Sequence, residues 1–225
     1  MDERIRQAGL LYEQAVFSGE ESLLADADRQ LDAVEADLAV ARGRLRHTRF
    51  VLGRDHAPDQ TVEDPGELAL FERAVQLYRA LGDLRGEAEA LFWVGCFHQV
   101  VRRDDAAAGP ALEHSLHLAC QAGDKATLAE VLRHLGIQAH RAGSLDLARQ
   151  RLEESTGLRR EMGQLTGVAA NLVGLAYIAL AQGRRDDALA LLDEGSAIAN
   201  EAQAQRILGQ INEARRTVAA RPSAG

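Results

Sequence analysis

The sequence predicts an all-α protein, an α-solenoid in which antiparallel helix pairs stack side by side. A pattern of apolar and small residues between Gly123 and Ile198 recurs 40 residues apart, which is typical of stacked supersecondary units. Within each copy, apolar residues recur at spacings of three and four, the period of one helix face. The chain is rich in alanine, leucine, glutamate and arginine and has only four prolines, so helix is favoured nearly everywhere and strands are not expected.

The two copies define a unit of two helices. Gly143 and Gly183 lie between two apolar stripes, where a left-handed residue is expected to end the first helix. Beyond the second stripe Gly163 faces Gln203 and the match ends. No helix pair buries its apolar face alone, so the pairs are expected to stack. The matched positions are Leu132/Leu172, Leu135/Leu175, Gly136/Ala176, Ala139/Ala179, Gly143/Gly183, Asp146/Asp186, Ala148/Ala188, Leu152/Leu192, Glu153/Asp193, Glu154/Glu194 and Leu158/Ile198.

The order L-x-x-L-G-x-x-A-x-x-x-G-x-x-x-x-A-x-x-x-L from Leu132 to Leu152 resembles the tetratricopeptide repeat (TPR) family. The usual period of that family is about 34 residues. The longer period here, together with L-R-R-E-M-G-Q at Leu158 to Gln164, resembles the extended repeats of bacterial regulator and signalling proteins. The resemblance covers Asp64 to Ala220. It implies a right-handed superhelix and an interaction role.

Residues 1–63 are predicted to form N-terminal helices that belong to a degenerate repeat. A short amphipathic helix from Asp2 to Phe17 precedes a long helix with a heptad seam. The seam fits either a coiled coil that forms a homodimer or a long helix packed antiparallel against its own neighbours. A loop from Gly53 to Asp64, with Pro58 inside it, follows. The seam consists of Leu24, Leu31, Leu38 and Leu45, with Ala27, Val34, Ala41 and Thr48 three places after each.

Residues 64–206 are predicted to hold the TPR-like repeats, and the whole chain is expected to form one continuous body. Asp64 is the expected N-cap of a helix whose first turn contains Pro65. This helix, which includes Glu67 to Leu81, is expected to be the second helix of its pair. In the next pair, Gly109-Pro110 is expected to kink or delay the second helix. Residues 207–220 are predicted to form a capping helix and residues 221–225 a disordered tail.

Composition disfavours several functions. A formal charge of −8 and a pI near 5.4 disfavour nucleic-acid binding, which needs a basic face. The charged start MDERIRQ and the absence of a long apolar run predict neither a signal peptide nor a membrane span. Cys96 and Cys120 lie on different predicted helices, so no disulfide framework is expected and a reducing cytoplasm fits.

The resemblance also implies a binding groove, because the first helix of each pair lines a concave surface in the family. Such a groove would grade from aromatic through charged to apolar, which suits a peptide or a protein segment. The family's clamp of lysines and asparagines for two carboxylates is not matched, so capture of a free peptide C-terminus is not expected. The groove positions carried over are Glu89, Phe92, Cys96 and Gln99 in one pair, Glu130, Arg133, Ile137, His140 and Arg141 in the next, and Val173, Tyr177 and Leu180 in the third, with Trp93 and His134 at the edge.

The leading hypothesis is therefore a non-catalytic, cytoplasmic interaction module without a cofactor. One alternative is a regulatory protein whose ligand or signalling peptide changes the pitch of the array. Another is an enzyme with a pocket around His134 and His140, although the sequence has no glycine-rich phosphate loop, nucleophile elbow or paired-cysteine signature.

Two further polar features stand out in the sequence. His114, His117 and Cys120 are spaced by three, as metal ligands on one helix can be, but no carboxylate completes the set, so no metal is predicted. Asn171 lies on a nearly apolar helix, and its amide is expected to bond to the backbone of a neighbouring helix.

Overall fold

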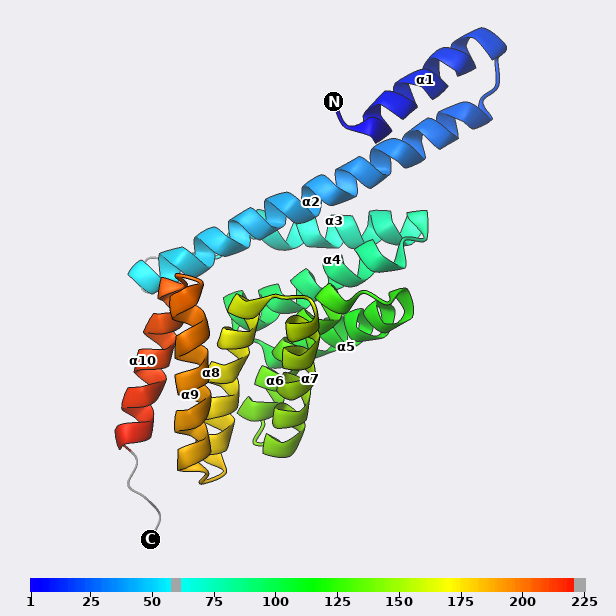
Figure 1. Cartoon of the computed structure of the whole chain (residues 1–225). Helices are drawn as coiled ribbons and strands as arrows, with labels where there is room; N and C mark the ends of the chain where they lie inside the picture. The colour runs from blue at the N-terminus through cyan, green and yellow to red at the C-terminus, as the bar shows by residue number, and fades with distance from the viewer. Residues whose placement is uncertain (58–61, 221–225) are drawn as a thin grey trace. The chain divides into compact units, whose positions relative to one another are not determined.

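The computed structural model describes residues 1–57 and 62–220, and all regular structure in these ranges is helical (Figure 1). This confirms the predicted all-α fold of antiparallel helix pairs, with α2 paired to α3, α4 to α5, α6 to α7 and α8 to α9. Pro58 and the predicted tail, residues 221–225, lie outside the described residues. The elements are α1 (Glu3–Ser18), α2 (Ser22–His56), α3 (Pro65–Leu81), α4 (Leu84–Cys96), the π-helix η2 (Phe97–Arg102), α5 (Asp105–Ala122), α6 (Lys125–Arg141), α7 (Leu145–Glu161), α8 (Leu165–Ala181), α9 (Arg185–Glu201) and α10 (Gln205–Ala220).

The chain divides into two compact units rather than the one continuous body that the sequence predicted. Unit 1 is Met1–Asp124 and unit 2 begins at Lys125. The division follows Gly123, a left-handed residue that ends α5, so it falls between two helix pairs and each unit contains whole pairs.

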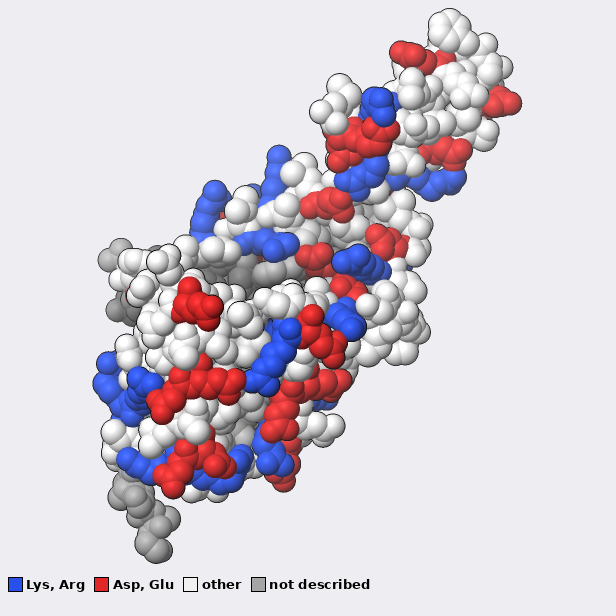
Figure 2. Space-filling model, in the orientation of Figure 1, with Lys and Arg blue, Asp and Glu red and all other residues white. Residues whose placement is uncertain are grey.

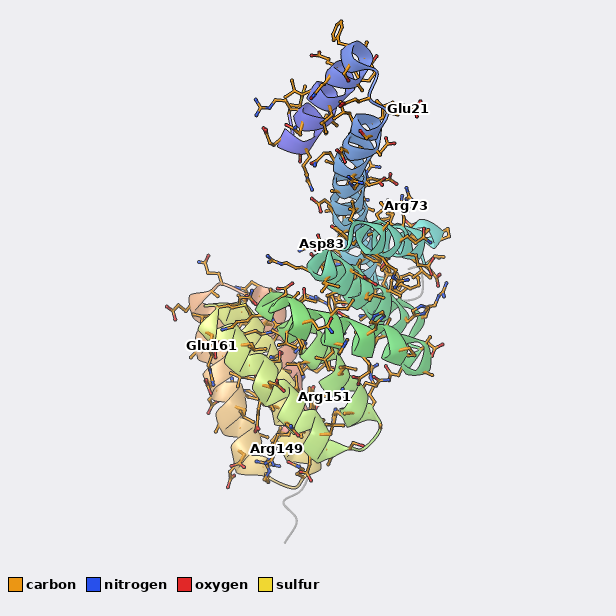
Figure 3. All side chains as sticks on the ribbon, turned by 90° about the vertical axis from the view of Figure 1, so that its right-hand side faces the viewer. Glu21, Arg73, Asp83, Arg149, Arg151 and Glu161 are labelled. Carbon is orange, nitrogen blue, oxygen red and sulfur yellow. The ribbon has the colours of Figure 1, made fainter. Side chains whose placement is uncertain are left out.

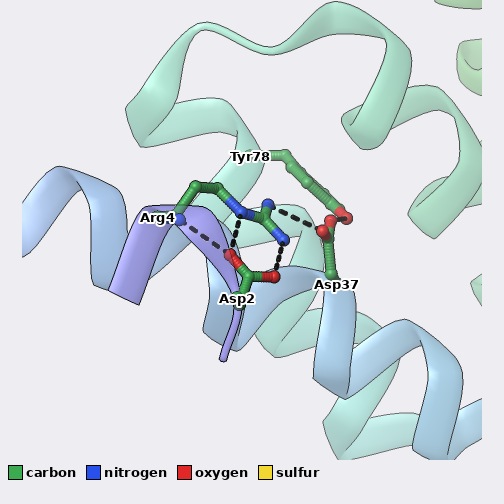
Figure 4. Close-up of polar contacts among 4 residues, drawn as sticks. All are labelled: Asp2, Arg4, Asp37 and Tyr78. Carbon is green, nitrogen blue, oxygen red and sulfur yellow. Dashed lines mark hydrogen bonds and ion pairs between the residues drawn. The ribbon is translucent and has the colours of Figure 1, made fainter. Parts of the chain in front are cut away.

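In unit 1, a polar cluster joins the first three helices (Figure 4). The Asp2 side chain caps α1 by accepting a hydrogen bond from the Arg4 amide. Arg4 forms an ion pair with Asp37 of α2 at 2.7 Å, and the Tyr78 hydroxyl of α3 donates to Asp37 at 2.6 Å. Burial and the hydrogen bond to Asp37 raise the pKa of Tyr78. The first turn of α1 is thereby fixed near the middle of α2.

The π-helix η2 absorbs an extra residue in the pair formed by α4 and α5. Gly95 and Leu112, which pack together, are one residue further apart in sequence than the corresponding Gly136 and Leu152. A π turn accommodates an inserted residue without ending the helix. The backbone then turns through Arg103, which is left-handed at φ 56°.

The proline in α5 does not delay that helix, which begins at Asp105, so the predicted delay was wrong. Asp104 accepts a hydrogen bond from the Ala107 amide and caps α5, and the helix continues through Pro110. A capped first turn is already established before the position where the proline removes a donor.

In unit 2, the turns agree with the predicted ones. Gly143 and Gly183 are left-handed, at φ 77° and 76°, and each follows a first helix, as predicted. Gly163 and Gln203 are left-handed too, at φ 69° and 53°, although the sequence match ends there. The backbone geometry of the pair therefore continues where the residue types diverge, because αL is accessible, though less favoured, for residues other than glycine.

Each pair is built around one close approach between its helices. A Cβ added to Gly43 would lie 2.4 Å from the Phe71 ring, and one added to Gly95 would lie 2.6 Å from Leu112. The corresponding distance from Gly136 to Leu152 is 3.1 Å. In α8 the matched position carries a Cβ, since it is Ala176, which is buried.

A second shared contact is a hydrogen bond from a second-helix serine to a first-helix carbonyl. Ser115 donates to the Ala88 carbonyl and Ser155 to the Ala129 carbonyl, both at 2.6 Å. The pair of α8 and α9 has Gly195 at this position, near the Ala169 carbonyl.

Candidate functional site

Most of the groove residues predicted in unit 1 are buried. Phe92, Cys96 and Gln99 all have less than 5% of their surface exposed. The Phe92 ring packs edge-on against Trp93, with 5.0 Å between centroids. These three side chains therefore belong to the core of unit 1, which corrects the prediction that Phe92 and Gln99 contact a ligand. Cys96 faces α2, where its Sγ lies 3.6 Å from His47 Nε2.

A charged and aromatic patch remains at the surface of unit 1. Trp93 is half-buried and stacks on Phe71 at 5.6 Å. The Arg44 guanidinium lies over the Trp93 ring at 5.5 Å and contacts the Glu89 carboxylate at 3.4 Å. Arg44 was not predicted, because the sequence of α2 shows a heptad pattern in place of the repeat pattern that defines the groove positions. We call Arg44, Glu89 and Trp93 the unit 1 patch.

Beneath this patch lies a buried polar cluster that the sequence analysis missed. His47 Nδ1 is 2.8 Å from Glu67 Oε1, and His47 Nε2 is 3.6 Å from Cys96 Sγ. The order thiol, imidazole, carboxylate is that of a nucleophilic triad. All three side chains are buried, however, and Glu67 Oε2 has no hydrogen-bond partner. A substrate could not reach Sγ without opening the unit, so we interpret the cluster as part of the core.

The apolar end of the predicted groove in unit 2 is also covered. Val173 and Leu180 are only 8% and 7% exposed, and they share a cluster with Ile211 and Val218 of α10. Tyr177 is half-buried against the same cluster. The C-terminal helix α10, which packs on α8 and α9, thus occupies the place that the sequence analysis assigned to a ligand at Val173 and Leu180.

Two charged groove residues of α6 are engaged in packing. Glu130 forms an ion pair with the buried Arg159 at 2.7 Å. Arg133 donates from Nη1 to the Ala170 carbonyl at 3.0 Å and to Asn171 Oδ1 at 2.9 Å. These bonds connect α6 to α7 and to α8.

Asn171 has side-chain partners rather than the predicted backbone partner. Its Nδ2 donates to Ser155 Oγ at 2.9 Å, and its Oδ1 accepts from Arg133. The same Ser155 donates to the Ala129 carbonyl. A continuous chain of hydrogen bonds therefore runs through the three helices and holds Arg133 in place.

The remaining groove residues in unit 2 retain exposed surface. His134, Ile137 and His140 on α6 are half-buried and Arg141 is exposed. Burial lowers the pKa of His140, and the positive charge of Arg141 lowers it further. Because six residues along an α-helix turn the chain through about 240°, His134 and His140 lie on different faces. Helix geometry therefore gives no support to a pocket shared by these two histidines. We call Ile137, His140, Arg141 and Tyr177 the unit 2 surface.

A hollow of about 320 Å³ lies on the second-helix side of unit 2. Its volume is near the lower end for small-molecule pockets. Its rim is charged: Arg184 pairs with Asp187 at 2.6 Å, and Glu194 pairs with Arg160 at 2.6 Å. Arg149 projects from α7 (Figure 3). The lining residues are Arg149, Glu153, Leu175, Arg184, Asp187, Ala190, Leu191 and Glu194. The repeat pattern does not reveal this hollow, because its residues come from three helices.

Two further observations concern residues 1–57 and 62–220. No group of three or more histidine, cysteine or acidic side chains in these ranges is arranged to hold a metal ion, and His114, His117 and Cys120 are exposed on α5. No helix in the same ranges is long and apolar enough to cross a bilayer.

Solved structures share this fold at low sequence identity. The crystal structure of BtubC (BKLC) from P. vanneervenii is 15% identical, with a TM-score of 0.51, and the match covers 90% of this chain and 93% of that one. TPR-like repeats of a kinesin light chain from Podosopora anserina are 17% identical, with a TM-score of 0.40, over 76% of this chain and 96% of that one. No family model matches the sequence, and the search of curated proteins found no match. The likeness to BtubC and the internal repeat together define a TPR-like helical-repeat fold.

Proposed function

We propose that this chain is a non-catalytic interaction module of the TPR type, which binds a peptide or protein segment on its first-helix faces. The supporting observation is the unit 2 surface. Neighbouring groove positions are used in packing, whereas Ile137, His140, Arg141 and Tyr177 retain exposed area. Aromatic, aliphatic and basic side chains with exposed area are the kinds of residue that anchor an interface.

The chemistry of this surface favours a segment with an apolar residue next to an acidic one. Ile137 and the exposed part of Tyr177 would bury the apolar residue, and Arg141 would pair with the carboxylate. Arg133 stabilises this surface indirectly, because its hydrogen bonds to the Ala170 carbonyl and Asn171 hold α6 against α8. The unit 1 patch offers a similar combination in Trp93 and Arg44.

A second candidate is the sensing role, in a cytoplasmic bacterial regulator. The hollow bordered by α7 and α9 favours it, because its apolar floor at Leu175 and Leu191 and its charged rim would suit a small zwitterionic ligand. Such a ligand would act on the array by favouring one arrangement of neighbouring pairs.

The test removes the anchors of the unit 2 surface. A partner is captured from lysate with the whole chain, its binding segment is mapped, and the Kd of a synthetic peptide is measured by calorimetry. We expect Ile137→Ser with Tyr177→Ala to weaken binding by at least about 30-fold, because the loss of a single anchor residue at about 2 kcal/mol already has that effect.

The matched control is Leu147→Ser, an exposed apolar residue on the second helix α7. It should leave the Kd unchanged. If the control weakens binding and the double variant does not, the second-helix side is the binding face and the proposal fails.

A further inference from the structure

A stripe of leucines runs along α2 and is only partly covered by the elements that the structure describes. Seven residues make nearly two turns of helix, so side chains at this spacing share one face. Each of the five is between 43% and 59% exposed. The heptad spacing that the sequence showed for four of them continues to the fifth. The leucine stripe consists of Leu24, Leu31, Leu38, Leu45 and Leu52.

The matching face of α8 is buried, which shows what such a face does in this fold. When Gly43 is aligned with Ala176 through their shared place in the pair, Leu38 corresponds to Asn171 and Leu45 to Ile178. Asn171 is 0% and Ile178 1% exposed, and α8 packs against the preceding second helix, α7. The stripe therefore lies where a helix is expected to pack.

The preceding helix in unit 1 does not reach the second half of the stripe. α1 packs on α2. The first turn of α1 lies near Asp37 of α2, with which Arg4 forms an ion pair. Figure 1 shows α1 alongside only the N-terminal part of α2. Leu38, Leu45 and Leu52 consequently lie beyond the start of α1.

Charges beside the stripe change sign halfway along the helix. Four residues after successive leucines come Asp28 and Glu35, then Arg42 and Arg49. Figure 2 shows basic side chains over the C-terminal half of α2. Asp28, Arg42 and Arg49 form no ion pair within residues 1–57 and 62–220, and Glu35 has an exposed one with Arg73. In a parallel, in-register pair of α2 helices, the two acidic halves would lie together and so would the two basic halves. An antiparallel pair instead brings each acidic half against a basic half.

We propose that the leucine stripe is the seam of an antiparallel homodimer, with α2 of a second copy as its occupant. This inference is independent of the proposed peptide-binding surfaces. If the two helices cross near residues 38–41, Asp28 faces Arg49 of the partner subunit, and Glu35 faces Arg42 of the partner subunit. The same register sets Leu38 against Ala41 of the partner subunit and Leu31 against Thr48 of the partner subunit. Ala41 and Thr48 are exposed in this structure, and large residues facing small ones let two helices approach closely.

The first test is the oligomeric state of the full chain, by sedimentation velocity up to about 100 µM, where a Kd in the micromolar range gives mostly dimer. We expect a dimer, and we expect Leu38→Lys with Leu45→Lys to be a monomer of unchanged helix content. Leu147→Lys, at an equally exposed leucine on α7, should remain dimeric. A wild-type monomer throughout, or a dimer that survives the double lysine variant, would overturn the proposal.

The second test fixes the orientation by charge reversal. Asp28→Arg or Arg49→Asp alone creates two like-charge contacts in the antiparallel dimer, and each should weaken the dimer by about tenfold. The combined variant restores both pairs and should return the Kd to near the wild-type value. Circular dichroism of each variant checks that it is folded. If the combined variant is as weak as the single ones, the antiparallel register is wrong.

Discussion

His47 in unit 1 and His140 in unit 2 occupy the same place in their helix pairs. Each lies four residues after the glycine that approaches a second-helix side chain, Gly43 or Gly136. His47 is buried against the Glu67 carboxylate, whereas His140 is half-buried beside Arg141. One histidine is a core residue and the other a surface residue.

The difference comes from the second helix rather than from the histidine. Glu67 lies four residues before Phe71, and the corresponding residues in the other pairs are Ala108, Ala148 and Ala188. All four positions are completely buried. A carboxylate in place of a buried alanine needs a hydrogen-bond partner, which His47 provides. In the pair of α6 and α7 the second helix has Ala148 at this position, so His140 has no carboxylate partner there and stays half-buried.

The largest expected effect comes from breaking this buried pair. His47→Ala leaves Glu67 without either of its oxygens bonded, because Oε2 is already unpaired. We expect a loss of about 3 kcal/mol in the free energy of unfolding, as for other buried polar pairs that lose one member. Urea denaturation measures the loss, and hydrogen exchange should locate it in unit 1.

Two further variants make this prediction specific. His47→Ala combined with Glu67→Ala should regain a large part of the lost stability, because the unpaired carboxylate is gone. His140→Ala in unit 2 should cost less than about 1 kcal/mol, as is usual for a partly exposed side chain. Equal losses for His47→Ala and His140→Ala would contradict the comparison.

A smaller graded effect is expected from adding one methyl group at the close approaches. Gly43→Ala would place a Cβ 2.4 Å from the Phe71 ring, and Gly136→Ala would place one 3.1 Å from Leu152. Overpacking at this level costs about 1–3 kcal/mol, so we expect Gly43→Ala to lie in that range. Gly136→Ala should be nearly neutral, because the gain of up to about 1 kcal/mol in helix propensity offsets the smaller cost of overpacking at this position.

The matched measurement is the midpoint of urea unfolding for the two alanine variants and for Gly95→Ala. Gly95, at 2.6 Å, should fall between them. A reversed order would mean that Phe71 moves away from α2 more readily than Leu152 moves away from α6.

The helix pairs themselves could be predicted from the sequence because local signals specify them. Apolar residues at spacings of three and four gave the helices. Asp64 and Gly143 mark helix ends through bonds and angles that involve only nearby residues. The insertion in η2 could not be foreseen, since a π turn leaves no residue signature of its own.

The exposure of the groove residues could be predicted only in part. Val173 is an apolar residue at a groove position, and its burial depends on α10, which is more than 30 residues later in the chain. The bond between His47 and Glu67 joins two helices across an intervening loop, and no spacing rule links such residues. Position within the repeat predicts a helix face, but the neighbouring helix decides which side chains of that face remain accessible.

The smallest expected effect is a pH dependence from His140. Burial lowers the pKa of His140 in the folded protein below the ordinary value of 6.5, so between these two values the unfolded chain binds more protons. Stability therefore rises with pH across this window. The contribution of His140 to stability is complete above about pH 6.5, and it falls as the solution is acidified toward the folded pKa. His140→Gln should flatten the curve of unfolding free energy below about pH 6.5, and urea titrations at several pH values measure it. His134→Gln, at a half-buried histidine on another face of α6, serves as the control. If this control flattened the curve as much as His140→Gln, the pH dependence would not belong to His140. If His140→Gln left the slope unchanged, the carboxylates of the chain, and not this histidine, would set the acid response of unit 2.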